Sequence, residues 1–278
     1  MNVTSINWTN MTWNPVSGCE KVSEGCKHCY AETIAEKFRG KAFPNGFELT
    51  LRPHKLREPC RLRTPSLVFV NSMSDLFWER IPDDYRDRIL DVIEETPHHE
   101  YQVLTKRPEV MRAYAKRRKL PPNFWAGVTI ESNRHVDRAD ILRDVDAEIR
   151  FISAEPLLSA LPDLDLTGMQ WVITGGESGA HLMEPEVCAR RALVEHRAGR
   201  WHLRDDRLPW LREIRDTCRA AGVAYWHKQH GGPHPESAGR TFDGQTYDAL
   251  PRYPHREADT AMTMLPVERA AVVEAMLQ

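Results

Sequence analysis

The sequence predicts a parallel β/α barrel, full or partial, and three observations support this fold class. Short apolar runs alternate with helical stretches along most of the 278 residues, which is the pattern of β/α units. The runs are continuously apolar, as in strands of a parallel sheet that is covered on both faces. Each run also ends in polar residues, and in β/α barrels the carboxyl ends of the strands form the functional mouth.

The strands and helices follow one another along the chain. Strands are expected at residues 11–13, 66–70, 101–104, 124–128, 149–152, 171–174 and 223–226. Helices are expected at residues 30–39 and 83–95, from 108, near 134–144, at 208–221 and, as an amphipathic helix, at 267–276. Pro108 suits the first position of a helix, and Gly222 suits the position just past the end of one.

The composition is that of an ordinary soluble globular protein, with 41% hydrophobic and 28% charged residues. The formal net charge is −2, so any affinity for nucleic acid must come from a local patch. We expect one domain over residues 1–278, with an irregular C-terminal extension from about residue 230. No apolar stretch approaches the ~20 residues that span a membrane, and no export signal opens the chain. We therefore expect a cytoplasmic protein without membrane contact, whose thiols stay reduced.

Residues 13–32 form the loop around which the chain is organised, because they hold three of the six cysteines. Cys19, Cys26 and Cys29 have the spacing C-x6-C-x2-C, which in a reducing compartment indicates a metal centre rather than a disulfide. Gly18 and Gly25 let the backbone turn tightly and bring amide groups towards the sulfur atoms.

Two kinds of centre fit this spacing. A structural zinc ion needs four ligands in a tetrahedron, so a fourth would come from elsewhere, with His28, His54 and Cys60 as candidates. A 4Fe-4S cluster can instead be held by the three cysteines, with one iron left open to bind a further ligand. Cys218 lies in a predicted helix and is expected to be a core residue, whereas Cys60 and Cys188 are structural residues, extra ligands or hydrogen donors.

Polar residues follow the expected strands, where they would ring the same cavity as the three cysteines. Any one of them could instead cap the next helix or satisfy a turn, but their recurrence after each strand favours a shared site. These residues are Asn71, Ser72, Ser74, Asp75, Thr105, Lys106, Arg107, Glu131, Ser153, Glu155, Gly175, Gly176, Glu177, Lys228 and Gln229.

Several short motifs make the chain resemble a known family. They are Trp13-Asn-Pro-x-x-Gly-Cys19, Gly25-Cys-x-x-Cys-Tyr-Ala-Glu32, Asn71-Ser-Met-Ser-Asp75, Leu104-Thr-Lys-Arg-Pro108, Phe151-Ile-Ser-Ala-Glu-Pro-Leu157, Gly175-Gly-Glu-Ser-Gly179 and Lys228-Gln-x-Gly231. The chain is similar to a phage-associated bacterial family of unknown function with a three-cysteine motif. Through its cysteine loop it also resembles the radical S-adenosylmethionine enzymes, although their usual spacing is C-x3-C-x2-C.

This resemblance implies a radical S-adenosylmethionine fold, a 4Fe-4S cluster on the three cysteines, and S-adenosyl-L-methionine on the open iron. The reduced cluster would generate a 5'-deoxyadenosyl radical that abstracts hydrogen from a substrate, while protein side chains supply orientation and exclude water. No catalytic side chain of the protein itself is implied. The implied cofactor-binding residues are Ser72, Ser74 and Asp75 for the methionine amino group, Glu155 and Glu177 for ribose or amino contacts, Gly175 and Gly176 for close approach of the adenosine, and also Lys106 and Lys228.

Two basic segments bear on the substrate. Residues 52–63 carry five lysines and arginines against one acid, and residues 106–119 carry seven against one. Either segment would track a phosphate backbone or form a solvated helix face. We expect a nucleic acid base or nucleotide as the substrate of a modification or repair reaction, reached by base flipping or in a single strand. The alternative is a zinc- or iron–sulfur-stabilised protein without catalysis, which binds nucleic acid or senses redox state.

Overall fold

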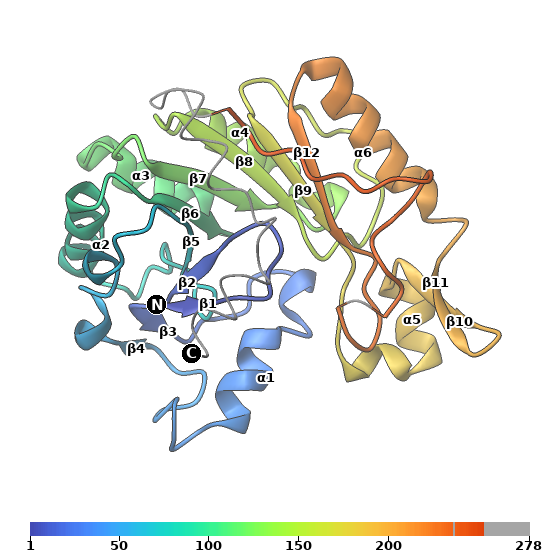
Figure 1. Cartoon of the computed structure of the whole chain (residues 1–278), viewed down its shortest axis with the longest axis horizontal. Helices are drawn as coiled ribbons and strands as arrows, with labels where there is room; N and C mark the ends of the chain where they lie inside the picture. Colours follow the sequence, from blue (N-terminus) through green and yellow to red (C-terminus); the bar gives the residue numbers. More distant parts are fainter. Residues whose placement is uncertain (236, 253–278) are drawn as a thin grey trace.

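The sheet is an open, curved half-barrel whose strands follow the order of the chain. A computed structural model describes residues 1–235 and 237–252, and the helix expected at 267–276 lies outside them. Eight strands form the sheet in the order β1-β2-β5-β6-β7-β8-β9-β12, and neighbouring strands are parallel except for β1 and β2. The partial barrel predicted from the sequence is therefore confirmed (Figure 1).

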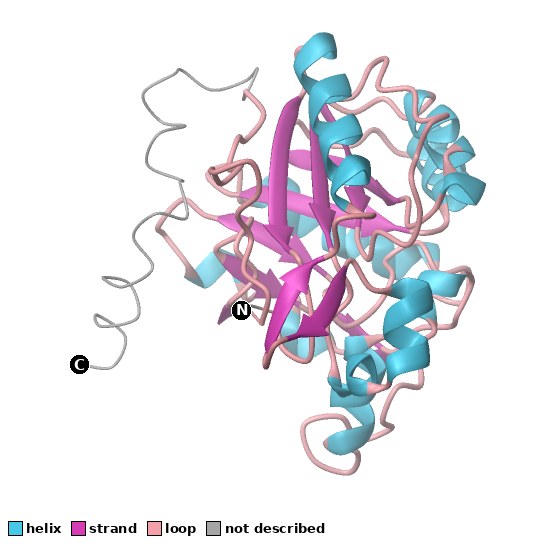
Figure 2. Ribbon diagram, turned by 90° about the vertical axis from the view of Figure 1, so that its right-hand side faces the viewer, coloured by secondary structure: helices cyan, strands magenta, loops and turns pink. Residues whose placement is uncertain are grey.

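All seven expected strands are present, and most extend further at their carboxyl ends. The sheet consists of β1 (Asn2–Val3), β2 (Met11–Trp13), β5 (Leu67–Val70), β6 (Glu100–Thr105), β7 (Phe124–Thr129), β8 (Ile149–Ala154), β9 (Trp171–Gly175) and β12 (Ala224–Gln229). The helices on its outer face are α2 (Asp83–Glu95), α3 (Pro108–Arg117), α4 (Asp137–Arg143) and α6 (Leu208–Ala221), and the 3-10 turn η4 (Asn133–His135) precedes α4 (Figure 1 and Figure 2).

Alternate side chains of the strands fill two separate cores. Outward-facing residues such as Val68, Val103 and Val172 are buried against the helices. Inward-facing residues form a second cluster that includes Trp125 and Phe151 in the amino-terminal half of the barrel. Burying each of these side chains stabilises the fold by about 1.5–3 kcal/mol. Because aromatic rings fill this half of the barrel, the free space is left at the carboxyl ends of the strands.

The N-terminal segment closes the open side of the half-barrel. Trp8 is buried inside the sheet, with its ring centroid 4.8 Å from that of Phe69. Asn7 Nδ2 donates a hydrogen bond to the Lys228 carbonyl at 2.9 Å, and Trp226 Nε1 donates one to Asn7 Oδ1 at 3.1 Å. The segment thus links the β2 side of the sheet to β12, a contact that the sequence did not predict.

The remaining elements lie in two long connections, one between β2 and β5 and one between β9 and α6. The cysteine loop and the segment after it contain β3 (Val16–Ser17), η1 (Glu24–Cys26), α1 (Tyr30–Lys37), β4 (Thr50–Leu51), η2 (Pro53–Lys55) and η3 (Pro59–Arg61). The connection from β9 to α6 contains η5 (Ala180–Met183), α5 (Pro185–Arg191), β10 (Val194–Arg197) and β11 (Arg200–Leu203), none of which was predicted. Within the described ranges, the helices are too short or too polar to cross a membrane.

Candidate functional site

A cavity of about 1060 Å³ opens at the carboxyl ends of the strands. Small-molecule sites in proteins are typically about 300–1,000 Å³, so this one has room for a cofactor and part of a substrate. Nine of the twelve residues predicted for the site line it, namely Cys19, Cys26, Cys29, Ser72, Ser74, Asp75, Lys106, Glu155 and Lys228. Apolar side chains of the cysteine loop, of the helix after it and of the segment beyond also line the cavity, among them Val22, Tyr30, Ile34 and Phe47. The cavity therefore has a polar floor at the strand ends and an apolar rim.

The first cysteine is positioned by a close backbone crossing at Gly18. Gly18 has a φ of +90°, and a Cβ atom there would lie 2.2 Å from the Glu48 carbonyl oxygen, so only glycine fits. Its amide donates to the Met73 carbonyl at 3.0 Å, and Ser74 Oγ donates to the Gly18 carbonyl at 2.7 Å. These contacts fix Cys19 beside the carboxyl end of β5, and they give Ser74 a role in holding the loop.

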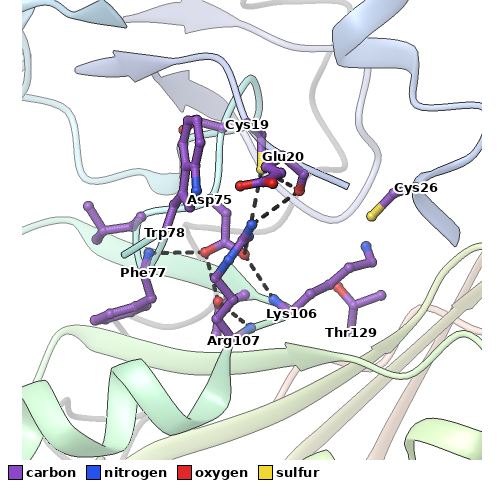
Figure 3. Close-up of polar contacts among 12 residues, drawn as sticks. Cys19, Glu20, Cys26, Asp75, Phe77, Trp78, Lys106, Arg107 and Thr129 are labelled. Atoms are coloured by element: carbon purple, nitrogen blue, oxygen red, sulfur yellow. Dashed lines mark hydrogen bonds and ion pairs between the residues drawn. The ribbon is translucent and has the colours of Figure 1, made fainter. Parts of the chain in front are cut away.

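Asp75 is the centre of a buried hydrogen-bond network beside the cysteine loop (Figure 3). Its Oδ1 accepts hydrogen bonds from the Phe77 amide at 3.0 Å and from Thr105 Oγ1 at 2.7 Å. Its Oδ2 accepts from the Lys106 amide at 3.0 Å and from Arg107 Nη1 at 3.1 Å. A carboxylate has about four lone-pair sites, and this one uses all of them. Asp75 therefore joins the ends of β5 and β6. Neither of its carboxylate oxygens is left free to accept a hydrogen bond from the amino group of a ligand.

Arg107 extends this network to the sulfur of Cys19. Arg107 Nη1 donates to Cys19 Sγ at 3.8 Å, and Nη2 donates to the Glu20 carbonyl at 3.1 Å. The Arg107 side chain is 6% exposed, so its charge is screened less than a surface charge. Burial and the Asp75 carboxylate raise the pKa of the Cys19 thiol to about 11, and Arg107 opposes this shift. The sequence placed Arg107 at the mouth of the barrel, but nothing in it distinguished Arg107 from its polar neighbours.

The loop around the second cysteine, Cys26, is held by a hydrogen bond to a buried carboxylate, Glu131, at the end of β7. Ser23 Oγ donates to Glu131 and also lies 3.7 Å from Cys26 Sγ. Glu131 is buried and accepts a hydrogen bond from Arg138 Nη1 at 2.8 Å. The buried ion pair anchors Ser23, and through it the loop around Cys26. The sequence placed Glu131 near the cavity, but it carried no signal for the part that Ser23 plays.

Glu24 also holds the cysteine loop to the segment after β7, and this contact makes the stability of the fold depend on pH. Its carboxylate accepts hydrogen bonds from Ser132 Oγ at 2.5 Å and from His135 Nε2 at 2.9 Å. Burial opposes ionisation, but these hydrogen bonds outweigh it and lower the pKa of Glu24 from 4.5 to about 2. Because the pKa of Glu24 is lower in the folded protein, the ionised carboxylate stabilises the fold fully at pH values above the pKa of the unfolded state. This stabilisation is lost as the pH falls towards about 2, the pKa in the folded state.

We expect Glu24→Gln to lower Tm near neutral pH and to match the wild type at acidic pH. The Glu24 side chain is 34% exposed, so after solvent screening the difference should be about 1 kcal/mol. Thermal unfolding of both proteins, followed by circular dichroism over a pH series, measures it. A difference in Tm that stays constant as the pH falls would contradict a stabilising role of the ionised Glu24 carboxylate.

Comparison with known proteins adds a family and a fold. Residues 3–191 and 198–251 match a family described as protein of unknown function (DUF5131). The chain belongs to this family. No curated protein matches the chain.

Two solved structures of spore photoproduct lyase resemble this DUF5131 protein. A cysteine-to-serine mutant is 12% identical, with a TM-score of 0.50 over 78% of this chain and 75% of the lyase chain. The lyase complexed with dinucleoside spore photoproduct is also 12% identical, with a TM-score of 0.48 over 77% and 74%. At this identity the first match bears on the fold alone. It shows that the DUF5131 protein shares the half-barrel fold of this lyase.

Three predicted residues of the DUF5131 protein, at the end of β9, do not line the cavity. A Cβ atom at Gly175 would lie 2.4 Å from Glu155 Oε1, and one at Gly176 would lie 1.9 Å from the His230 carbonyl oxygen. Glycine is therefore required at both positions by contacts within the chain. Glu177, the third of these residues, is also buried behind the lining.

Glu177 instead ties the connection after β9 to the cysteine loop. It accepts hydrogen bonds from Arg191 at 2.7 and 2.9 Å, and Arg191 Nη2 also donates to the Glu24 carbonyl at 3.1 Å. Nearby, His28 stacks on His181 with ring centroids 4.1 Å apart. His28, one of the candidates for a fourth zinc ligand, is therefore engaged with η5.

The polar floor contains one paired and one unpaired lysine. Lys228 Nζ lies 3.2 Å from Glu155 Oε1. Lys106 also lines the cavity, and within residues 1–235 and 237–252 it forms no ion pair with a carboxylate. Ser72 exchanges hydrogen bonds with Asn14 at 3.1 and 3.2 Å. Lys106 thus brings a positive charge to the floor, and although burial opposes it, this charge and that of Arg138 lower the pKa of the Glu131 carboxyl.

The spacing of the thiols bears on the kind of metal centre. Zn–S bonds of about 2.3 Å in a tetrahedron place sulfur atoms about 3.8 Å apart. In the described part of the chain, the ligand atoms that all lie within 4.8 Å of one another belong to Glu24, Glu131 and His135, and the three thiols form no such group. The thiols, as placed, are therefore spaced more widely than the ligands of one zinc ion.

The other cysteines lie away from the cavity. Cys218 is fully buried in the core beneath α6, as predicted. Cys60 is half-buried and packs against the outer core, and Cys188 is half-buried against the small core of the η5–α5 connection. His54 is exposed on η2. None of these side chains, as placed, can join the three thiols around one metal.

Most cations of the two basic segments lie away from the cavity, but Lys106 and Arg107, at the start of the second segment, line it. Arg61 leads into β5, and Lys116 and Lys119 lead into β7, so these cations lie near the amino-terminal ends of the strands. Arg117 and Arg118 pair with acidic side chains of α2 at 2.7 and 2.8 Å. Binding of nucleic acid through residues 52–63 or 106–119 stays a prediction.

Proposed function

We propose that the protein is a radical S-adenosylmethionine-like iron–sulfur enzyme that acts on a nucleic acid base or nucleotide. The observation that carries this proposal is the arrangement of the cavity, where three thiols face the polar carboxyl ends of the strands. Cys19, Cys26 and Cys29 would hold a 4Fe-4S cluster, with S-adenosyl-L-methionine on the remaining iron.

The donor set supports a cluster. Soft thiolates suit iron–sulfur centres, and these thiols are spaced more widely than the ligands of one zinc ion. Arg107 beside Cys19 would offset the negative charge of a thiolate-bound cluster, as polar neighbours of metal ligands commonly do. Bound together in reduced form, the cluster and S-adenosyl-L-methionine supply a 5'-deoxyadenosyl radical for hydrogen abstraction.

The strand ends would bind and orient the S-adenosyl-L-methionine. Lys106, which lines the cavity and forms no ion pair with a described carboxylate, suits its methionine carboxylate. Ser72 and Glu155 remain our candidates for its amino and ribose groups. Asp75 would act indirectly, because its oxygens are already used to hold Arg107. Glu177 would act from behind the loop through its contact with Arg191.

The rim favours a planar, uncharged group in the substrate. Tyr30, Ile34 and Val22 line the cavity and remain 50%, 39% and 44% exposed. Aromatic and apolar side chains of this kind stack on nucleic acid bases, which they bind irrespective of sequence. A base seated there would also exclude water from the polar floor.

Metal analysis of anaerobically purified protein tests this proposal against a structural zinc site. We expect brown protein with a broad visible absorbance, about four irons and about four sulfides per chain. Colourless protein with one zinc per chain would contradict the proposal and support a protein without catalysis.

A further inference from the structure

The connection between β9 and α6 forms a small lobe that borders the cavity. It has its own core, which includes Leu182 and Val194. Ser178 and Gly179, directly before η5, line the cavity, and Arg191 at the end of α5 donates to the carbonyl of Glu24 in the cysteine loop. Figure 1 shows α5 and the β10–β11 hairpin at the same end of the molecule as α1. The lobe is therefore one side of the mouth.

The tip of the β10–β11 hairpin brings two arginines directly opposite each other. Its turn consists of Ala198 and Gly199, with φ values of 51° and 77°, which is the pattern of a type I′ turn. In the register that this turn sets, Arg197 pairs with Arg200. Like charges directly opposite on neighbouring strands are destabilising, and Ala198 pays a further cost for its left-handed backbone.

The charges within the lobe do not cancel this repulsion. In the described part of the chain, Arg200 forms no ion pair, and Arg197 contacts only Glu195, at 3.6 Å, in a pair whose side chains are 61% and 43% exposed. Such exposed pairs contribute little. Arg190 is also exposed and unpaired among the described residues, although a basic residue at the end of α5 is explained by the helix dipole alone.

The sequence of the lobe shows the same imbalance. Residues 185–204 contain five arginines and two glutamates. Two of the arginines are used inside the protein, since Arg191 pairs with Glu177 and Arg204 pairs with Asp206. The remaining three, Arg190, Arg197 and Arg200, are exposed on the lobe.

We propose that the hairpin tip, Arg197 and Arg200, binds the phosphate backbone of a single nucleic acid strand and presents a base to the cavity. A phosphate between the two guanidinium groups would relieve their repulsion, and arginine matches phosphate with paired hydrogen bonds. The exposed ring of Tyr30 at the rim would stack on the base once it leaves the strand. This inference rests on the proposed function, which takes a nucleic acid as the substrate. It adds the hairpin tip as the surface that binds this substrate.

The test measures binding of a short fluorescein-labelled single-stranded oligodeoxynucleotide by fluorescence anisotropy at several salt concentrations. Each phosphate contact on a single strand contributes about 0.7 to the slope of log K against log salt. The double variant Arg197→Ala/Arg200→Ala should therefore bind more weakly and lose about 1.4 from this slope. Arg197→Lys/Arg200→Lys, which keeps both charges, should retain most of the slope.

The matched control is Lys116→Ala/Lys119→Ala, which removes two cations at the other edge of the sheet and should leave binding unchanged. An unchanged slope in the hairpin alanine variant would overturn the inference, and so would loss of binding in the lysine variant alone. Binding to phosphatidylserine vesicles without binding to the oligonucleotide would also overturn it.

Iron analysis of the same samples separates this inference from the proposed function. Hairpin-dependent binding by protein without iron would support the inference while the proposed function fails. A cluster-loaded wild type that binds no oligonucleotide would overturn the inference alone.

Discussion

Replacing Cys19, Cys26 or Cys29 singly by alanine should remove most of the bound iron. Three thiolates are the only protein ligands proposed for the cluster, and loss of one leaves an iron without a protein bond. The loop itself should persist, because Gly18, Ser23 and Glu24 hold it through contacts that do not involve sulfur. Iron and sulfide analysis with the visible spectrum measures the effect.

Cys218→Ala is the control for this experiment, since Cys218 is the fully buried thiol on the core-facing side of α6. It should retain the iron content of the wild type. Full iron in all three loop variants would remove the cluster assignment.

Arg107→Gln should shift the reduction potential of the cluster to a more negative value while most of the iron is retained. Reduction adds a negative charge to the cluster, and the buried Arg107 guanidinium beside Cys19 favours that charge. A shift on the order of 60 mV is expected, which corresponds to a tenfold change in a one-electron equilibrium. Asp75→Asn should shift the potential in the opposite direction, because it removes a negative charge from the same network.

A redox titration followed by electron paramagnetic resonance measures these potentials. Arg112→Gln is the control, because Arg112 is a surface residue of α3, the helix that directly follows Arg107, and it pairs with Asp144 at 3.0 Å. A purely structural Arg107 would alter iron content or Tm and leave the potential of the remaining cluster unchanged, which would contradict the electrostatic role.

The alternating strands and helices of the half-barrel could be predicted, because their buried residues form recognisable apolar patterns in the sequence. Strands such as β8 are buried on both faces and read as continuous apolar runs. The helix at residues 208–221 has the expected bounds, since Gly222 adopts a φ of 67° that ends it. Most of the cavity residues were also predictable, because parallel strands deliver the polar residues at their ends to the same edge.

The unpredicted parts depend on contacts between distant residues or on weak local signals. The β10–β11 hairpin is polar along most of both strands, and its Ala-Gly turn is not a common turn signal. The position of Asp75 at the cavity was predictable. That hydrogen bonds within the protein occupy both of its carboxylate oxygens was not, because two of the donors are Lys106 and Arg107 at the end of the next strand. Trp8 closes the barrel through packing that no pattern in its own segment reveals.

The central claim is that the cavity binds a reduced cluster and S-adenosyl-L-methionine together. Its most direct test is to incubate the reduced, iron-loaded protein anaerobically with S-adenosyl-L-methionine and to quantify 5'-deoxyadenosine by chromatography. We predict slow release of 5'-deoxyadenosine without a substrate, faster release when a single-stranded oligonucleotide is added, and none from Cys26→Ala. An intact, reduced cluster that neither binds S-adenosyl-L-methionine nor releases 5'-deoxyadenosine would contradict the account.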